Sequence, residues 1–285
     1  MAPRLVCDVS ESVWRALVDE SEQSGEPIAV VIDRVLASAF ELDRHTLFQV
    51  STSNALVQGV FRGAVTVADL KRNGDFGLGT FQDLDGELVM VDGVCYRASG
   101  GGVVNMPTDA TQVPFAVVTR FHPDASTTTG PGTLLDLTES IDALRPSQNQ
   151  FVGIRVDGHF DRLELRAACA AEPGEGLLEA TAHQSEFNVL DEIGTLVGFW
   201  APLYARAVNV PGYHFHFISE DRALGGHVLG IEAGQLEVGI HIESELHVAI
   251  PETEEFLAAD LSGDHQAALH QAETGSTRTE GARLR

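Results

Sequence analysis

From residue 47 onward the chain is dominated by short runs of β-branched and aromatic residues, each ended by Gly, Asp or Pro. Clear examples are TLFQVSTS, ELVMVDGVCYRA, PFAVVTRF, QFVGIRVDGHFDRLELRAA and GTLVGFW. Runs of this composition, bounded by turn-forming residues, predict β-strands. Helical spacing occurs within 61–73 and in SIDALRP near 140–146. We therefore expect a few short helices around a large amount of sheet.

Residues 9–43 have a different pattern, which predicts two helices around the break SGEP. Ser10 can cap the first helix, whose apolar residues at helical spacing are Val13, Trp14, Leu17 and Val18. A short strand before two helices also resembles a ribbon-helix-helix DNA-binding arm. That arm needs basic residues, and only Arg4 precedes these acidic helices. We therefore interpret 1–46 as a helical extension used for packing or dimerisation.

The charge of the chain limits the classes of partner. There are 18 basic and 42 acidic residues, a formal net charge of −24. Sequence-independent binding to nucleic acid or to anionic lipid needs clustered cations, so this charge argues against both. Lys71, the only lysine, lies in the turn-like LKRNGD, which favours a solvated residue over Schiff-base chemistry. Small molecules or proteins are the expected partners.

The cysteines and the N-terminus bear on the cellular compartment. Cys7, Cys95 and Cys169 are odd in number and far apart, and no CxxC pair occurs. This pattern indicates reduced thiols rather than a disulfide framework or a cysteine zinc site. The N-terminus becomes polar too early for a secretion signal, and no apolar run approaches the roughly 18 residues of a membrane helix. We therefore expect a cytoplasmic protein without membrane contact.

The stretch PGYHFHFISEDRALGGHV at 211–228 contains three histidines. If it forms a β-hairpin, His214 and His216 lie on one face of a strand and the neighbouring aromatic residues on the other. A hairpin that closes around Asp221–Arg222 sets His227 opposite His216, and directly opposed Cβ atoms are about 4.5–5.5 Å apart. The three imidazoles can then converge on a zinc ion. The alternative is a hairpin with neutral histidines on a solvated face.

A site of three histidines differs from a structural zinc site, which is usually closed by four protein ligands. Three ligands leave one coordination position open for a substrate or a water molecule. If these histidines bind zinc, the sequence favours a catalytic ion over a structural one.

Two longer motifs resemble the α-acetolactate decarboxylases. They are GDFGLGTFQDLDGELVMVDGVCYRA at 74–98 and VGFWAPLYARAVNVPGYHFHFISEDRALGGHV at 197–228, and the resemblance covers roughly 47–273. It implies a zinc-dependent, homodimeric lyase that converts 2-acetolactate to acetoin and carbon dioxide, with His214, His216 and His227 as ligands. In this reaction, loss of the carboxylate leaves an enediolate, whose charge a Lewis acid stabilises.

The resemblance also assigns roles to two residues far from the histidines. Glu87 in LDGEL matches an acidic residue that delivers a proton, although the same residues also fit an exposed turn before a strand. Arg166 in DRLELRAA matches a pocket arginine that can bind the substrate carboxylate or an anionic intermediate. Arg162 lies on the same predicted strand face and is the rival candidate, and a solvated charged stripe is the alternative.

Two further assignments rest on shorter matches. The family has a glutamate near the C-terminus that reaches the metal pocket, and spacing suggests Glu273, with Glu280 or a fraying helix end as alternatives. Thr80 in GLGTF matches a pocket threonine that can hydrogen-bond the substrate, and its other possible role is to close a glycine turn. His183 is interpreted as a structural histidine.

We therefore expect an α/β fold dominated by two β-sheets with flanking helices, and catalytic histidines on a β-hairpin. The expected parts are the extension 1–46, a mixed-sheet half at 47–180, an antiparallel half at 181–273 and a flexible tail at 274–285. The expected function is zinc-dependent decarboxylation of 2-acetolactate. The alternatives are a non-catalytic zinc-containing binding or sensor protein, and a related enolisation of another β-keto acid.

Overall fold

The computed structural model describes residues 6–39, 45–172, 174–182 and 184–274. The expectations for Arg4, His183 and Glu280 lie outside these residues, as does nearly all of the tail. The chain divides into two compact units, 1–44 and 45–285. The proposed subdivision of the second unit at residue 180 stays a prediction.

The first unit is a helical hairpin. Its helices are α1 (Glu11–Ser24) and α2 (Ile28–Ala39), which contact each other. The Ser10 hydroxyl accepts a hydrogen bond from the N–H of Val13 at 3.4 Å, and α1 ends where Gly25 adopts a φ of 72°. A left-handed residue at a helix end favours glycine. Both predicted helices and the Ser10 cap are thus confirmed.

One sheet of the second unit has, among the described residues, seven strands in the order β15-β1-β8-β3-β4-β5-β6. All neighbours are antiparallel except β1 and β15, which are parallel. The strands are β1 (Thr46–Val50), β3 (Phe76–Thr80), β4 (Glu87–Val91), β5 (Val94–Ala98), β6 (Val104–Asn105), β8 (Phe115–Thr119) and β15 (Glu245–Ala249). Two short strands, β2 (Val65–Thr66) and β7 (Gln112–Val113), pair separately.

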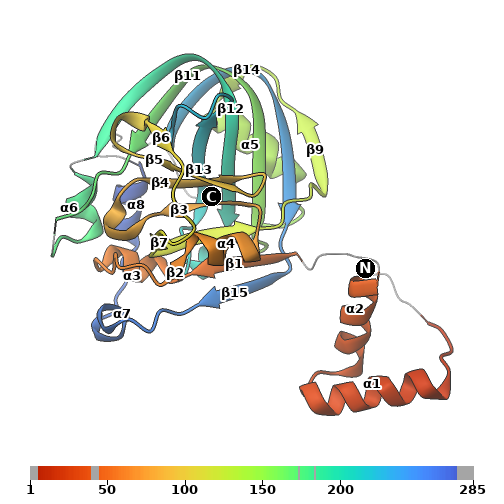
Figure 1. The fold of residues 1–285 in the computed structure, drawn as a ribbon. Helices are drawn as coiled ribbons and strands as arrows, with labels where there is room; N and C mark the ends of the chain where they lie inside the picture. The colour runs from red at the N-terminus through yellow and green to blue at the C-terminus, as the bar shows by residue number, and fades with distance from the viewer. Residues whose placement is uncertain (1–5, 40–44, 173, 183, 275–285) are drawn as a thin grey trace. The chain divides into compact units, whose positions relative to one another are not determined.

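The other sheet has six strands within the described ranges and the order β10-β14-β11-β12-β13, with β9 paired to β14. The strands are β9 (Ala125–Thr128), β10 (Gly132–Thr133), β11 (Val152–Ala167), β12 (Ser185–Ala201), β13 (Gly212–Ser219) and β14 (Gly225–Ile242). Because β13 pairs with both β12 and β14, the sheet curls back on itself. Figure 1 shows β11, β12 and β14 arching over the shorter strands of the first sheet.

Helices complete the second unit. They are α3 (Ser53–Val57), α4 (Val67–Asn73), α5 (Leu134–Leu144), α6 (Leu177–Thr181), α7 (Glu254–Ala258) and α8 (Gln266–Thr274), with 3₁₀ turns η1 (Gln82–Leu84), η2 (Gly100–Gly102) and η3 (Leu203–Ala205). The predicted helix in 61–73 is α4. The one expected near 140–146 is α5, which starts earlier. Among the described residues, no helix is long and apolar enough to cross a membrane.

Three hydrophobic clusters give the second unit a layered core. The first lies between the two sheets and includes Leu78, Val89, Val197, Phe199 and Ile218. The second packs α5 onto the six-stranded sheet through Leu137, Ile141, Ile154, Phe215 and Phe217. The third packs α4 onto the seven-stranded sheet through Val67, Leu70, Leu88 and Met90. The expected α/β fold with two large sheets is therefore confirmed.

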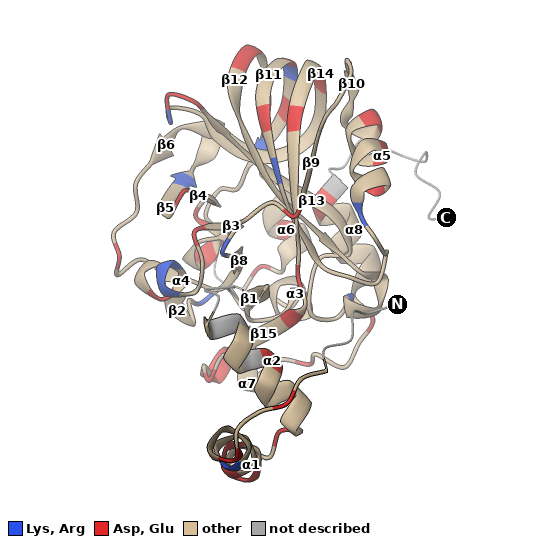
Figure 2. Ribbon diagram, turned by 90° about the vertical axis from the view of Figure 1, so that its right-hand side faces the viewer, with Lys and Arg blue, Asp and Glu red and all other residues tan. Residues whose placement is uncertain are grey.

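One strand begins earlier than its sequence predicts. GTLVGFW is only the second half of β12, which starts at Ser185 and pairs with β11 from Ser185 to Trp200 except at Asp191. The first half, SEFNVLDEI, contains Asp, Glu and Asn, which are depleted in strands, and pairing with β11 overrides this preference. Figure 2 shows acidic residues along the arching parts of β11, β12 and β14.

Candidate active site

The β13–β14 hairpin orients the three histidines as its sequence predicts. His216 pairs directly with His227. This is the pairing expected because the two residue numbers of each pair in an antiparallel hairpin add up to the same total. Phe215 and Phe217 point into the α5 cluster, whereas Ile218, on the histidine face, belongs to the cluster between the sheets. The alternation of side chains along β13 therefore directs the imidazoles toward the seven-stranded sheet.

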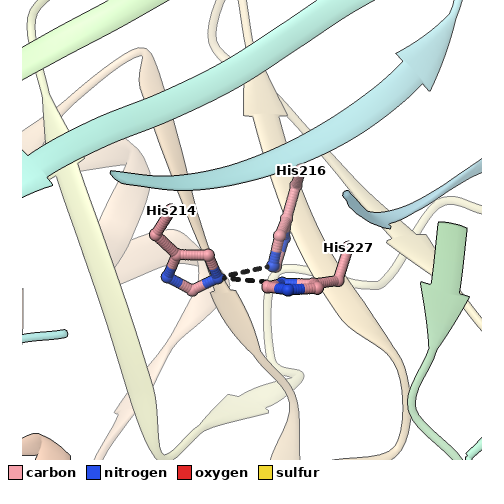
Figure 3. Close-up of side chains that lie close together, drawn as sticks. All are labelled: His214, His216 and His227. Carbon is pink, nitrogen blue, oxygen red and sulfur yellow. Dashed lines mark hydrogen bonds between the residues drawn. The ribbon is translucent and has the colours of Figure 1, made fainter. Parts of the chain in front are cut away.

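The three imidazoles converge on one point (Figure 3). Nε2 of His214 lies 3.2 Å from Nε2 of His216 and 3.1 Å from Nδ1 of His227. Their side chains are 11%, 1% and 6% exposed in the same order. The solvated-face alternative is therefore wrong, because these histidines lie in the interior.

Backbone carbonyls fix the protonation of two of these rings. Nδ1 of His216 donates to the carbonyl of Leu88 at 2.8 Å, and Nε2 of His227 donates to that of Glu273 at 3.0 Å. A carbonyl only accepts, so each of these nitrogens carries the proton of its neutral ring. Nε2 of His216 and Nδ1 of His227 therefore carry lone pairs, and both face Nε2 of His214. Nε2 of His214 can donate at most one proton to them.

A divalent cation fits this arrangement. With the proton of His214 on Nδ1, all three inward nitrogens carry lone pairs, which is a common zinc donor set, and ligand histidines usually donate their other N–H to a carbonyl or carboxylate. Burial lowers the pKa of His214 to about 3, with Arg166 adding to the effect. Burial also lowers the pKa of His216 and His227 well below the ordinary value. The three rings are therefore neutral, as ligation requires.

Two carboxylates face the histidine cluster. Oε2 of Glu87, on β4, lies 3.6 Å from Nε2 of His216, and Oε2 of Glu273, on α8, lies 3.6 Å from Nε2 of His214. Burial raises the pKa of Glu87 to about 7, opposed by Arg166 and by the N–H of Ala168. Burial raises the pKa of Glu273 as well. A carboxyl group with a pKa near neutrality is suited to proton transfer.

Arg166 supplies the positive charge of the site. It lies on β11 opposite His227, is 5% exposed, and donates through Nη1 to the carbonyl of Ala272. The rival Arg162 is 41% exposed and lies close to Glu164 and Glu232. The three histidines, Glu87 and Glu273 line a cavity. Of the two arginines, both of which the structure describes, Arg166 lines this cavity and Arg162 does not.

Thr80 ends β3 and pairs with Glu87. Its hydroxyl donates to the carbonyl of Gly86 at 3.0 Å, so it closes the turn before β4. It also lines the cavity, where its oxygen retains acceptor capacity. The two roles considered for Thr80 are therefore compatible.

The cavity has components that sequence reasoning missed. Its apolar wall comprises Leu56, Leu84, Phe115, Leu177 and Val210, and its polar lining also includes Thr181 and Gln184. A hydrophobic side chain gives no sign in the sequence of whether it packs in a core or lines a cavity. The carbonyl of Leu88 has no sequence signal at all, since every residue carries one.

A second histidine cluster differs from the first in the protonation of the nitrogens that face one another. His45, Asp124 and His241 also bring possible ligand atoms together. However, Nδ1 of His45 lies 2.6 Å from the carbonyl of Ile242, and Nδ1 of His241 lies 2.7 Å from that of His122. These nitrogens, which lie nearest to Asp124, must therefore carry protons. In this geometry they cannot ligate a metal.

Comparisons with known proteins point to one family. The family model for α-acetolactate decarboxylase matches residues 47–263. The α-acetolactate decarboxylase of Brevibacillus brevis is 38% identical over 233 residues, which are 81% of this chain and 82% of that protein. That of Methanosarcina mazei is 39% identical over 229 residues, 80% of each chain.

A solved structure gives the same result in three dimensions. The crystal structure of α-acetolactate decarboxylase from Bacillus subtilis superimposes with a TM-score of 0.78 and 35% sequence identity, covering 81% of this chain and all of that one. Glu273 lies beyond the end of the matched family model. The family match, the relatives and the common fold together show that this chain belongs to the α-acetolactate decarboxylase family.

Proposed function

We propose that this chain decarboxylates 2-acetolactate to acetoin and carbon dioxide, with zinc bound by His214, His216 and His227. The observation that carries the proposal is the buried convergence of three imidazole nitrogens, in which those of His216 and His227 lie 3.2 and 3.1 Å from His214 Nε2, with Glu87 and Arg166 lining the same cavity. Membership of the family supports the choice of substrate. When bound, zinc supplies a Lewis acid for the negative charge that develops on the substrate.

Arg166 binds the substrate carboxylate in this proposal. Nε of Arg166 is buried and has no hydrogen-bond partner among the described residues, so it has a donor to offer. A guanidinium and a carboxylate form a strong, charge-assisted hydrogen bond. The contact orients the bond between the carboxyl carbon and C2, which breaks to release carbon dioxide. The electron pair passes into the C2–C3 bond, and the ketone oxygen takes the charge.

Glu87 completes the reaction by donating a proton to C2, which gives acetoin. Its pKa of about 7 leaves a substantial protonated fraction near neutrality. The N–H of Ala168 donates to its Oε1 at 3.2 Å, so Oε2, which faces the histidines, carries the proton. After each turnover Glu87 regains its proton from solvent.

The proposal is tested with purified protein, stripped by chelation and reloaded with zinc. Metal analysis should give one zinc per chain, and the reloaded protein should release acetoin and carbon dioxide. His216→Ala should lose both the zinc and the activity, whereas His159→Ala, at a half-exposed histidine beside Asp191, should retain them. A zinc-loaded protein that binds 2-acetolactate without releasing acetoin would instead be a binding or sensor protein.

Two further properties belong to the same proposal. The family resemblance implies a homodimer, which light scattering of the purified full-length chain tests. The cytoplasmic location expected from the cysteines and the N-terminal sequence stays a prediction, and cell fractionation tests it.

A further inference from the structure

Two buried polar atoms of the cavity lack hydrogen-bond partners among the described residues. They are Nε of Arg166, a donor, and Oε1 of Gln184, an acceptor, and both residues line the cavity. Leaving a buried acceptor without a partner destabilises the fold, so such atoms are rare unless a ligand or water completes them. Gln184 therefore has the property expected of a ligand-binding side chain.

The sheet register explains why Gln184 reaches the site. β12 begins with Ser185, which pairs with Ala167 on β11, and Glu186 pairs with Arg166. Continued by one residue, this register sets Gln184 opposite Ala168 and diagonal to Arg166. Diagonal residues lie on the same face of a sheet, about 7–8 Å apart. The two unpaired groups therefore approach the cavity from adjacent strands without bonding each other.

The hydrogen-bonding groups of 2-acetolactate match this pair of atoms. At neutral pH its carboxylate and ketone only accept hydrogen bonds, and its 2-hydroxyl is the single donor. Arg166 Nε needs an acceptor, which the carboxylate provides. Gln184 Oε1 needs a donor, and only the hydroxyl provides one.

We propose that Gln184 is a specificity-determining residue whose amide oxygen accepts a hydrogen bond from the 2-hydroxyl of the substrate. The inference rests on the proposed function and deepens it. It restricts the substrate class to 3-oxo acids that carry a 2-hydroxyl group, and it disfavours 3-oxo acids without one. A site built to bond a hydroxyl discriminates against analogues that lack it, because its own polar group then stays unpaired.

The experiment compares Gln184→Met with wild type on two substrates, using zinc-loaded full-length protein. Met keeps the length of the side chain and removes the acceptor. The substrates are 2-acetolactate and 2,2-dimethyl-3-oxobutanoate, in which a methyl replaces the hydroxyl. We expect kcat/KM for 2-acetolactate to fall roughly tenfold and kcat/KM for the analogue to change little. Gln235→Met, at an exposed glutamine of β14, is the matched control.

Thermal unfolding separates a binding role from a structural one. Gln184→Met removes an unpaired buried oxygen, so its Tm should equal or exceed that of wild type. A lower Tm, equal losses on both substrates, or no loss on 2-acetolactate would overturn the inference. Wild-type protein that releases no acetoin would overturn the proposed function and this inference with it. If the wild type is active but Gln184→Met keeps the wild-type ratio of kcat/KM between the two substrates, the inference alone is overturned.

Discussion

Gly198→Ala tests whether the packing of β12 against β13 holds the metal ligands in place. Gly198 pairs with Phe215, which lies between His214 and His216 on β13. A Cβ atom at Gly198 would lie 2.1 Å from Cδ1 and 2.3 Å from Cε1 of Phe215. Non-bonded carbon atoms require about 3.5 Å or more, so the ring has to move by more than an ångström.

The ring has little room for such a movement. Phe215 is 3% exposed and lies parallel to Tyr213, with ring centroids 5.9 Å apart. Overpacking of a well-filled core costs about 1–3 kcal/mol. We expect Gly198→Ala to lose this much free energy of unfolding. We also expect weaker zinc binding, because β13 can relieve the overlap only by moving relative to β14, which carries His227.

Urea unfolding and zinc titration measure the two effects. Gly234→Ala, where an added Cβ meets no atom within 4 Å, is the matched control and should behave as wild type. In a Phe215→Leu background, the cost of Gly198→Ala should shrink, because the smaller side chain removes the overlap. An unchanged cost in that background, or wild-type stability of Gly198→Ala itself, would refute the reasoning.

Two further predictions concern buried carboxyl groups. Burial raises the pKa of Glu243 from 4.5 to about 8, so between these pH values the folded state keeps a proton that the unfolded chain has released. The free energy of unfolding should therefore fall with rising pH by up to about 1.4 kcal/mol per unit. Urea titrations at several pH values measure this effect. Over this range Glu243→Gln should become more stable relative to wild type, whereas the exposed control Glu237→Gln should not. If the free energies of unfolding of Glu243→Gln and wild type changed in parallel with pH, the prediction would be contradicted. Glu87→Gln keeps a side chain of the same shape, so zinc content should persist while kcat falls about 10²–10⁴-fold, and retained turnover would exclude Glu87 as the proton donor.

The histidine hairpin was predictable because its geometry is local. A tight antiparallel turn fixes the sum of paired residue numbers, so Asp221 and Arg222 at the turn suffice to pair His216 with His227. The period of two along a strand then assigns the imidazoles and the phenylalanines to opposite faces. No contact with a distant part of the chain enters this reasoning.

Other parts of the site depend on contacts that a sequence pattern does not encode. The carbonyls of Leu88 and Glu273 fix the two histidine tautomers, and both belong to segments far from the hairpin in sequence. Arg166 differs from Arg162 in its contact with α8, where the carbonyl of Ala272 accepts its hydrogen bond. Family resemblance selected Arg166, whereas alternation alone left both arginines open.

The site is built from both sheets, which links catalysis to the packing between them. The histidines lie on β13 and β14 of the six-stranded sheet, whereas Glu87 and Leu88 lie on β4 of the seven-stranded sheet. The hydrogen bond from His216 to the carbonyl of Leu88 therefore joins the two sheets one residue away from Glu87. A displacement that separates the two sheets lengthens this bond and moves the carboxyl group away from the histidines. The hydrophobic cluster between the sheets thus keeps Glu87, the proposed proton donor, close to the histidines that are the proposed metal ligands. A substitution that leaves a cavity in this cluster should therefore reduce turnover before it unfolds the protein.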